Sequence, residues 1–169
     1  MHVYVELAKK AVEEYIRNRK ILATPADIPL EMQQRAGVFI CLKSHGNLRG
    51  CIGTFHPGSN NLYEEIVRNS ISASTEDPRF SLVRPDELDD ITYTVDVLSE
   101  PEKISALSEL DPKKYGIIVT KGQRRGLLLP DLEGVDTIEE QLRITKSKAG
   151  IMPYDKDVEV YRFTVDRYV

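Results

Sequence analysis

A strictly alternating segment over residues 91–97 limits the fold more than any other part of this chain. Its apolar residues, Ile, Tyr, Val and Val, alternate with Thr, Thr and Asp. A period of two puts the apolar side chains on one face of a strand and the polar ones on the other. Such a half-buried strand is typical of an antiparallel sheet with helices on one face. The sequence therefore predicts an α+β fold with an antiparallel sheet flanked by helices.

Apolar residues recur at helical spacing in three segments. Residues 3–19 carry an apolar stripe, with acidic residues four positions before basic ones, and residues 62–74 carry a stripe of small and apolar residues. A third helix is expected to end at Gly150. The expected N-terminal caps are Ser59 or Asn60 for the second helix and Asp136 for the third.

The strand-forming segments fall into two hairpins and a final strand, each bounded by turn residues. The predicted strands are 37–44 with 48–54, 116–120 with 126–129, and 158–169. Each half of the chain then runs strand, Arg-Gly strand, helix, strand, with Arg49-Gly50 and Arg125-Gly126 in equivalent places. An internal duplication and a chance similarity of two hairpins both explain this order. We expect a single domain, residues 1–169, formed by two lobes that share one core.

Composition excludes several classes of protein. The 169 residues are 41% hydrophobic and 30% charged, with a formal net charge of −4. This is too apolar for a disordered chain and too acidic for a strongly basic nucleic-acid-binding protein. No apolar stretch approaches the ~20 residues of a membrane span. Two cysteines cannot form the disulfide framework of a secreted protein, so we expect a reducing, cytoplasmic setting.

The second strand of the first hairpin is the segment most informative about chemistry. Pairing that hairpin through a three-residue turn at 45–47 places Cys41 across from Cys51 and gathers Lys43 and Arg49 on the same face. Adjacent cations favour the thiolate of a cysteine and raise its reactivity. One hypothesis is therefore a reactive or ligand-binding thiol at Cys51 that Arg49 orients. The other is a buried cysteine that packs as a small hydrophobe.

Glycines and histidines near this strand bear on the same hypotheses. Gly50 and Gly53 indicate a bulge, or a close approach of the backbone to a ligand or to a helix. His56 is the better candidate general base of the two histidines near the hairpin. We predict no metal centre, with a site formed by Cys51, His56 and acids from elsewhere in the chain as the alternative. Four possible ligands are too far apart along the strands to bind one tetrahedral zinc ion: Cys41, His45, Cys51 and His56.

Two further clusters of charged residues could bind anions. Asp77 and Arg79 flank a proline, and the arginine offers a planar fork for a carboxylate or phosphate. A structural pairing of Arg79 with Glu76 or Asp86 is the alternative. The basic turn at 121–125 is either a solvated hairpin tip or a docking point for an anionic ligand or an acidic protein.

The second strand of the first hairpin, which we call the motif strand, resembles the signature of a known family. Residues 48–55, Leu-Arg-Gly-Cys-Ile-Gly-Thr-Phe, look like the extended hexapeptide of the family named after a candidate gene in the Alport-syndrome, midface-hypoplasia and elliptocytosis deletion region. Its bacterial and archaeal members are called AmmeMemoRadiSam system protein A. The segments that match the prokaryotic pattern cover the whole chain: 69–73, 77–80, 85–88, 95–98, 101–102, 110–116, 126–136 and 148–151.

The resemblance implies an α+β fold with a larger and a smaller lobe and a cleft near the hexapeptide. It also implies genomic association with a Memo-like protein and a radical-SAM protein, to one of which the domain is sometimes fused. A free-standing chain and a domain excised from a fusion both fit. The family supplies no established reaction, and no cofactor follows from the sequence. The residues that match its motif positions are Arg49, Gly50, Cys51 and Gly53, with Asp77 and Arg79 in a second block; His56 is not a dependable part of the motif.

Three functions follow as hypotheses. The first is an enzyme, or an enzyme component, that binds or acts on a small anionic substrate through Cys51 and Arg49. The second is a non-catalytic recognition or scaffold module for the Memo-like or radical-SAM partner. Nucleic-acid binding is disfavoured, because one short basic turn on an acidic chain neutralises few phosphates. In the first hypothesis His56 is a further catalytic candidate, and the binding residues are Gly50, Gly53, Asp77, Arg79 and Lys43.

Overall fold

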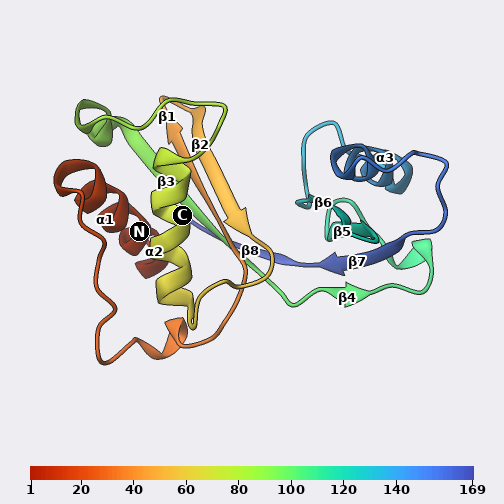
Figure 1. Cartoon of the computed structure of the whole chain (residues 1–169), viewed down its shortest axis with the longest axis horizontal. Coiled ribbons are helices and arrows are strands. Elements are labelled where there is room, and N and C mark those ends of the chain that lie inside the picture. The colour runs from red at the N-terminus through yellow and green to blue at the C-terminus, as the bar shows by residue number, and fades with distance from the viewer. The chain divides into compact units, whose positions relative to one another are not determined.

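Two four-stranded antiparallel sheets, each with its own helices, form the structure in Figure 1, a computed structural model that describes all residues from 1 to 169. Unit 1 comprises Met1–Leu98 and Asp166–Val169, and unit 2 comprises Ser99–Val165. The α+β class with antiparallel sheets and flanking helices is confirmed. None of the helices combines the length and the apolar composition that crossing a bilayer requires.

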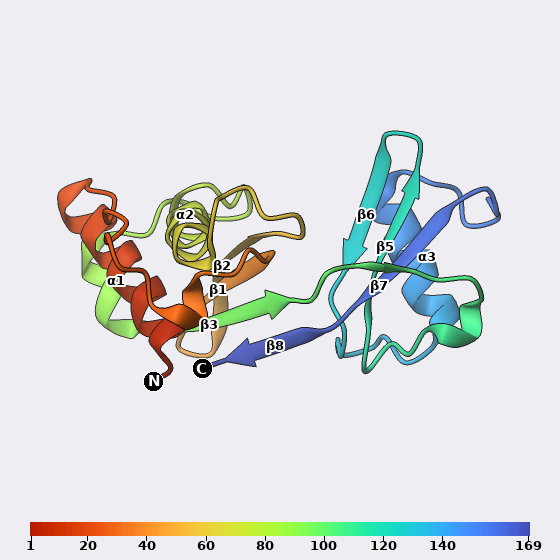
Figure 2. The same ribbon diagram turned by 90° about the horizontal axis from the view of Figure 1, so that it is seen from below.

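The sheet of unit 1 has the strand order β2-β1-β3-β8 and packs one face against two helices. From Val38 to Leu42, residues of β1 alternate between buried and half-buried, as expected for a strand with one covered face. Helix α2 lies on β1 and β2, and helix α1 lies on β3 (Figure 2). The bounds are α1 Val3–Asn18, β1 Val38–Ser44, β2 Asn47–Thr54, α2 Leu62–Thr75, β3 Ile91–Leu98 and β8 Val165–Tyr168.

The sheet of unit 2 has the strand order β4-β7-β5-β6, and helix α3 lies on β5 and β6. Its buried residues form a hydrophobic cluster with no member in common with that of unit 1. Each sheet therefore builds a core with its own helices. The single domain expected over residues 1–169 stays a prediction. The bounds are β4 Glu102–Lys103, β5 Gly116–Lys121, β6 Arg124–Leu128, α3 Ile138–Ala149 and β7 Glu159–Phe163; the 3₁₀ helices are η1 Leu30–Met32, η2 Pro85–Asp90 and η3 Leu107–Glu109.

The two units repeat one topology. In each, a hairpin is followed by a helix and then by a strand that pairs with the first strand of the hairpin. In each, a glycine of the second hairpin strand lies against a helix carbonyl. A Cβ on Gly50 would lie 2.1 Å from the Ala73 oxygen, and a Cβ on Gly126 would lie 2.3 Å from the Thr145 oxygen. The shared topology and the shared helix contact favour duplication over chance similarity.

The structure corrects the predicted last strand and two predicted helix caps. The strand predicted over 158–169 is two strands, β7 and β8, which join different sheets on either side of Thr164. The helix caps are displaced by one residue from those expected. Asn61 caps α2 by accepting from the Glu64 amide, and Thr137 caps α3 in the same way. In both cases the neighbouring residues are also good cap formers, so composition alone does not choose between them.

Candidate functional site

The motif hairpin places Cys41 opposite Cys51, as the sequence predicts, but by a different turn. The turn has two residues, His45 and Gly46, both with positive φ, at 51° and 81°. A bulge opposite Leu42 and Lys43 then shifts the register by one residue. A two-residue turn with a bulge gives the cysteines the same pairing as the three-residue turn that the sequence suggested.

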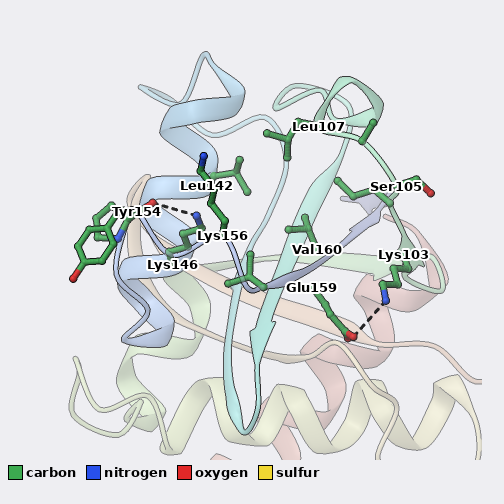
Figure 3. A pocket seen from close by; sticks show the side chains of 13 residues that line it. Lys103, Ser105, Leu107, Leu142, Lys146, Tyr154, Lys156, Glu159 and Val160 are labelled. Carbon is green, nitrogen blue, oxygen red and sulfur yellow. Dashed lines mark hydrogen bonds and ion pairs between the residues drawn. The ribbon is translucent and has the colours of Figure 1, made fainter.

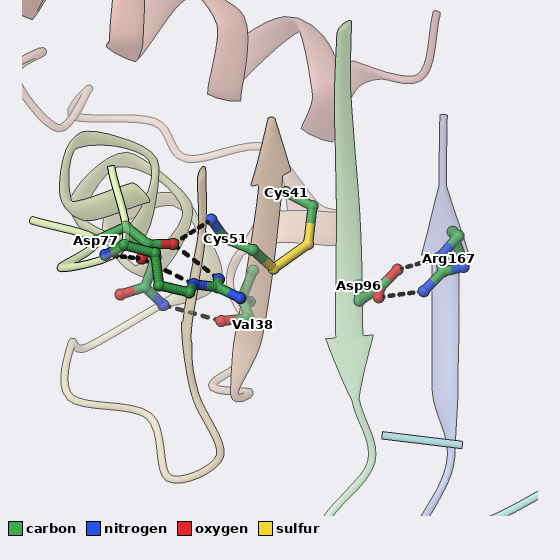
Figure 4. Close-up of a disulfide and its surroundings, with 8 residues drawn as sticks. Val38, Cys41, Cys51, Asp77, Asp96 and Arg167 are labelled. Carbon is green, nitrogen blue, oxygen red and sulfur yellow. Dashed lines mark hydrogen bonds and ion pairs between the residues drawn. A yellow bond between two sulfur atoms is a disulfide. The ribbon is translucent and has the colours of Figure 1, made fainter. Parts of the chain in front are cut away.

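The two cysteines form a disulfide across β1 and β2 (Figure 4), with their Cα atoms 4.2 Å apart. This separation is that of a non-hydrogen-bonded pair in an antiparallel ladder, where side chains are closest. The structure contains no free cysteine. The expectation of a free, cation-activated thiol at Cys51 is therefore wrong for this oxidised state.

We expect reduction of the disulfide to lower the free energy of unfolding by up to about 3 kcal/mol, because the bond closes a short loop in the unfolded chain. Denaturant titrations with and without dithiothreitol measure the difference. A double variant, Cys41→Ala with Cys51→Ala, is the control and should not respond to reductant. Equal midpoints for the native chain in both conditions, with two thiols that react without reductant, would contradict the disulfide.

Arg49 holds a distant loop rather than the Cys51 sulfur. Its Nε and Nη2 donate to the two Glu87 carboxylate oxygens at 2.8 and 3.1 Å, which holds the pKa of Glu87 below its usual range. Nη1 and Nη2 donate to the carbonyls of Ser81 and Leu82 at 2.9 and 3.1 Å. The Arg49 side chain is only 14% exposed. The expected pairing of Arg49 with Cys51 fails because the bulge takes Arg49 out of the simple alternation of side chains.

Asp77, from the second block of family-matching residues, accepts a hydrogen bond from the motif strand, as Figure 4 shows. Its carboxylate accepts from the Cys51 amide at 3.0 Å and from the backbone and guanidinium of Arg79 at 2.9 to 3.1 Å. The Asp77 side chain is 3% exposed, and these donors, the Arg79 side chain first, hold its pKa far below the usual range. The partner of Arg79 is thus Asp77, not Glu76 or Asp86 as expected. Since β2 is an edge strand, Asp77 satisfies an amide that would otherwise face outwards.

The other predicted site residues make packing contacts or lie at the surface. The Phe39 ring covers Gly53, where an added Cβ would lie 2.3 Å from a ring atom. His56 stacks obliquely with the Phe55 ring, at 4.7 Å between centroids. Lys43 is exposed on β1. Gly50 and Gly53 therefore serve close packing with a helix and an aromatic ring, one of the alternatives that the sequence left open.

A buried polar network on α2 was missed by sequence reasoning. Glu65 is completely buried and accepts from the Thr54 hydroxyl and from the amides of Gly58 and Ser59. Asn69 donates to the same Thr54 hydroxyl oxygen at 3.0 Å. The network ties the loop after β2 to the helix. The available signal was Asn69, a polar residue among the small and apolar residues of the predicted helix 62–74.

A second missed pair joins β3 to β8. Arg167 donates two parallel hydrogen bonds to Asp96, at 2.7 and 2.8 Å, and Asp96 is 1% exposed. The register places Asp96 on the same face of the sheet as Cys41 (Figure 4). We call this face, which is turned away from α1 and α2, the open face. It carries Phe39, Cys41, Lys43, Cys51, Thr94 and Asp96.

The basic turn of unit 2 is largely engaged in structural contacts. Lys121 forms an ion pair with Asp155, and Arg124 donates to the Gly150 carbonyl at 2.9 Å. These contacts tie the hairpin to the segment after α3. Across the chain, no group of three or more His, Cys, Asp or Glu side chains is arranged to hold a metal ion.

These features define a two-unit α+β protein with a motif strand held by a cross-strand disulfide, a half-buried arginine and a buried aspartate. The family model described as AMMECR1 matches residues 5–168. The chain therefore belongs to the AMMECR1 family, consistent with its resemblance to AmmeMemoRadiSam system protein A.

Relatives of known sequence and structure agree with this assignment. A Thermotoga maritima protein is 59% identical over 169 residues, covering 99% of this chain and 97% of that protein. A Clostridium acetobutylicum protein is 48% identical over 98% of this chain, but the match is only 35% of its own length. The crystal structure of an uncharacterised Pyrococcus horikoshii protein superposes with a TM-score of 0.88 at 36% identity, covering 97% of this chain and 88% of that one.

Proposed function

We propose that this chain is a non-catalytic recognition module that binds a partner protein through the open face of unit 1. The observation that carries the proposal is the use of the motif side chains. The Arg49 guanidinium is bonded to one carboxylate and two carbonyls, and the Asp77 carboxylate to one amide and Arg79. A motif whose polar groups bind one another shapes a surface and leaves few groups to bind substrate.

The open face has the composition of a binding surface. It combines the half-buried Phe39 ring and the exposed cation of Lys43 with the Arg167 guanidinium, which the buried Asp96 holds in place. Aromatic and arginine side chains are enriched at protein interfaces. In the Clostridium relative the matched region is 35% of that protein's length, which supports the proposal that this domain works beside another one. We propose the Memo-like protein or the radical-SAM protein as this partner, and the cytoplasm as the compartment.

The chemical function expected from the sequence, action on a small anion through Cys51 and Arg49, has weaker support. It requires the disulfide to be reduced, and glutathione in the cytoplasm favours reduction of exposed disulfides. It also requires the Arg49 guanidinium to leave Glu87. A Cys51 thiol that is alkylated with a pKa well below ~8.5 in the reduced protein would favour this function instead.

Binding to purified partners tests the proposal. We expect the tagged chain to form a complex with the Memo-like or the radical-SAM protein of the same organism, with a Kd of about 1 μM or below. Lys43→Glu on the open face should weaken that complex about tenfold, since it reverses a charge at the interface. Lys10→Glu is the matched control, because Lys10 is an exposed lysine on α1. Absence of a complex with either partner, or equal effects of the two variants, would overturn the proposal.

A further inference from the structure

The two units differ at one position of the repeated topology. In unit 1, Gly50 of β2 pairs with Leu42 of β1, and Leu42 pairs on its other side with Tyr93 of β3. In unit 2, Gly126 of β6 pairs with Val119 of β5, and Val119 pairs on its other side with Val160 of β7. Val160 is thus the counterpart of Tyr93.

Helix α1 covers Tyr93 in unit 1. Tyr93 is 5% exposed, and its pKa is raised by burial and by the nearby charge of Glu13, while Arg17 opposes the rise. Both charged residues belong to α1. Unit 2 has no corresponding helix, since α3 lies on β5 and β6. Instead, a cavity of about 560 Å³ lies over Val160.

The walls of this cavity, which we call the β7 pocket, come from four segments of unit 2 (Figure 3). Strand β7 supplies Val160, α3 supplies Leu142, and the segment through η3 supplies Leu107. The segment between α3 and β7 completes it with Tyr154. Leu107 is 53% exposed, so a large apolar side chain at the pocket is open to solvent. A volume of this size lies within the range of small-molecule sites, roughly 300–1,000 Å³.

Lysines dominate the charged groups of the pocket. Lys103, Lys146 and Lys156 line it, against one carboxylate, Glu159, which forms an ion pair with Lys103 at 3.3 Å. The Lys146 ammonium donates to the carbonyls of Pro153 and Asp155 at 3.2 and 3.0 Å. An ammonium has three N–H donors, so Lys146 is held in place with one donor left for a ligand. Lys156 is exposed and takes part in none of the ion pairs of the chain.

We propose that the β7 pocket binds a small organic anion with an apolar body, a carboxylate or a phosphate monoester. The anionic group binds Lys146 and Lys156, and the apolar body covers Val160, Leu142 and Leu107. Walls on several sides favour a small molecule over a partner helix, which needs a groove open at both ends. This site is independent of the partner surface on unit 1, because all of its residues belong to unit 2.

Calorimetric titration with octanoate and octyl phosphate tests the site, with octanol as the neutral control. We expect both anions to bind at least about tenfold more tightly than octanol, since a hydrogen bond to a charged group distinguishes them. Lys156→Met should weaken octanoate binding about tenfold and leave octanol binding unchanged. Lys146→Met should have a similar or larger effect. Lys43→Met on unit 1 is the matched control and should have no effect.

Because Lys146 also holds the segment at Pro153, its replacement can disturb folding, whereas Lys156 has no such contact. The Lys156 variant therefore decides the test if the Lys146 variant does not fold. Equal binding of octanoate and octanol would overturn the proposal, as would octanoate binding that is unchanged by Lys156→Met. Binding of an acidic amphipathic peptide in preference to octanoate would assign the pocket to a partner helix instead.

Discussion

Replacing Gly50 by alanine is expected to lower the free energy of unfolding of unit 1 by about 3 kcal/mol, at the upper end of the usual cost of overpacking. The added Cβ would lie 2.1 Å from the Ala73 carbonyl oxygen, where ordinary contacts are 3.4 to 4 Å. The obstacle is helix backbone, which cannot rotate away as a side chain can. Helix α2 must therefore move from the sheet by more than an ångström, with loss of contacts along its buried face.

The same substitution in unit 2 tests the repeat. A Cβ on Gly126 would lie 2.3 Å from the Thr145 oxygen, so Gly126→Ala should cost about as much. The hydrophobic cores of the two units have no residue in common, so each variant should destabilise its own unit. Hydrogen exchange measured amide by amide should show lost protection in unit 1 for Gly50→Ala and in unit 2 for Gly126→Ala.

Gly58→Ala is the matched control for both variants. The nearest atom to its added Cβ is the end of the flexible Arg68 side chain, at 3.0 Å, so the cost should stay below about 1 kcal/mol. If all three variants lose the same stability, close packing of glycine against a helix is not what the two units share.

The elements that depend on local pattern could be predicted from the sequence. Alternation at 91–97 identified β3, and helical spacing at 3–19 identified α1. The facing of Cys41 and Cys51 was also predicted, because period-two alternation and a short turn restrict the register to a few choices. The disulfide between them was not predicted, because oxidation depends on the compartment and not on spacing.

Features that depend on long-range contacts could not be predicted. A bulge adds one residue to one strand and leaves no unambiguous mark in the sequence, so the expected pairing of Arg49 with Cys51 failed. The final strand reads as one pattern, although its two parts pair with different sheets. The lysines of the β7 pocket are far apart in the sequence, and only the fold brings Lys103, Lys146 and Lys156 together.

Replacing Asp77 by alanine is expected to cost roughly 2–3 kcal/mol of stability, because one buried carboxylate holds both the edge of β2 and Arg79. The Cys51 amide loses its acceptor, and the bond between the segment after α2 and the motif strand is lost. Asp86→Ala is the matched control. Asp86 is 72% exposed and pairs with Arg84, which is 69% exposed, so its removal should cost well under 1 kcal/mol.

The pH dependence of stability separates the charge of Asp77 from its packing. Because its folded-state pKa lies far below the unfolded value of ~3.9, the ionised carboxylate contributes its full stabilisation above that value. The contribution declines as the pH falls from about 4 towards the folded-state pKa. Denaturant titrations between pH 6 and about pH 2.5 should therefore show a smaller loss of stability for Asp77→Asn than for the native chain. Identical pH profiles would show that ionisation of Asp77 does not stabilise the motif strand. Its hydrogen bonds to Cys51 and Arg79 would then be weaker than we expect.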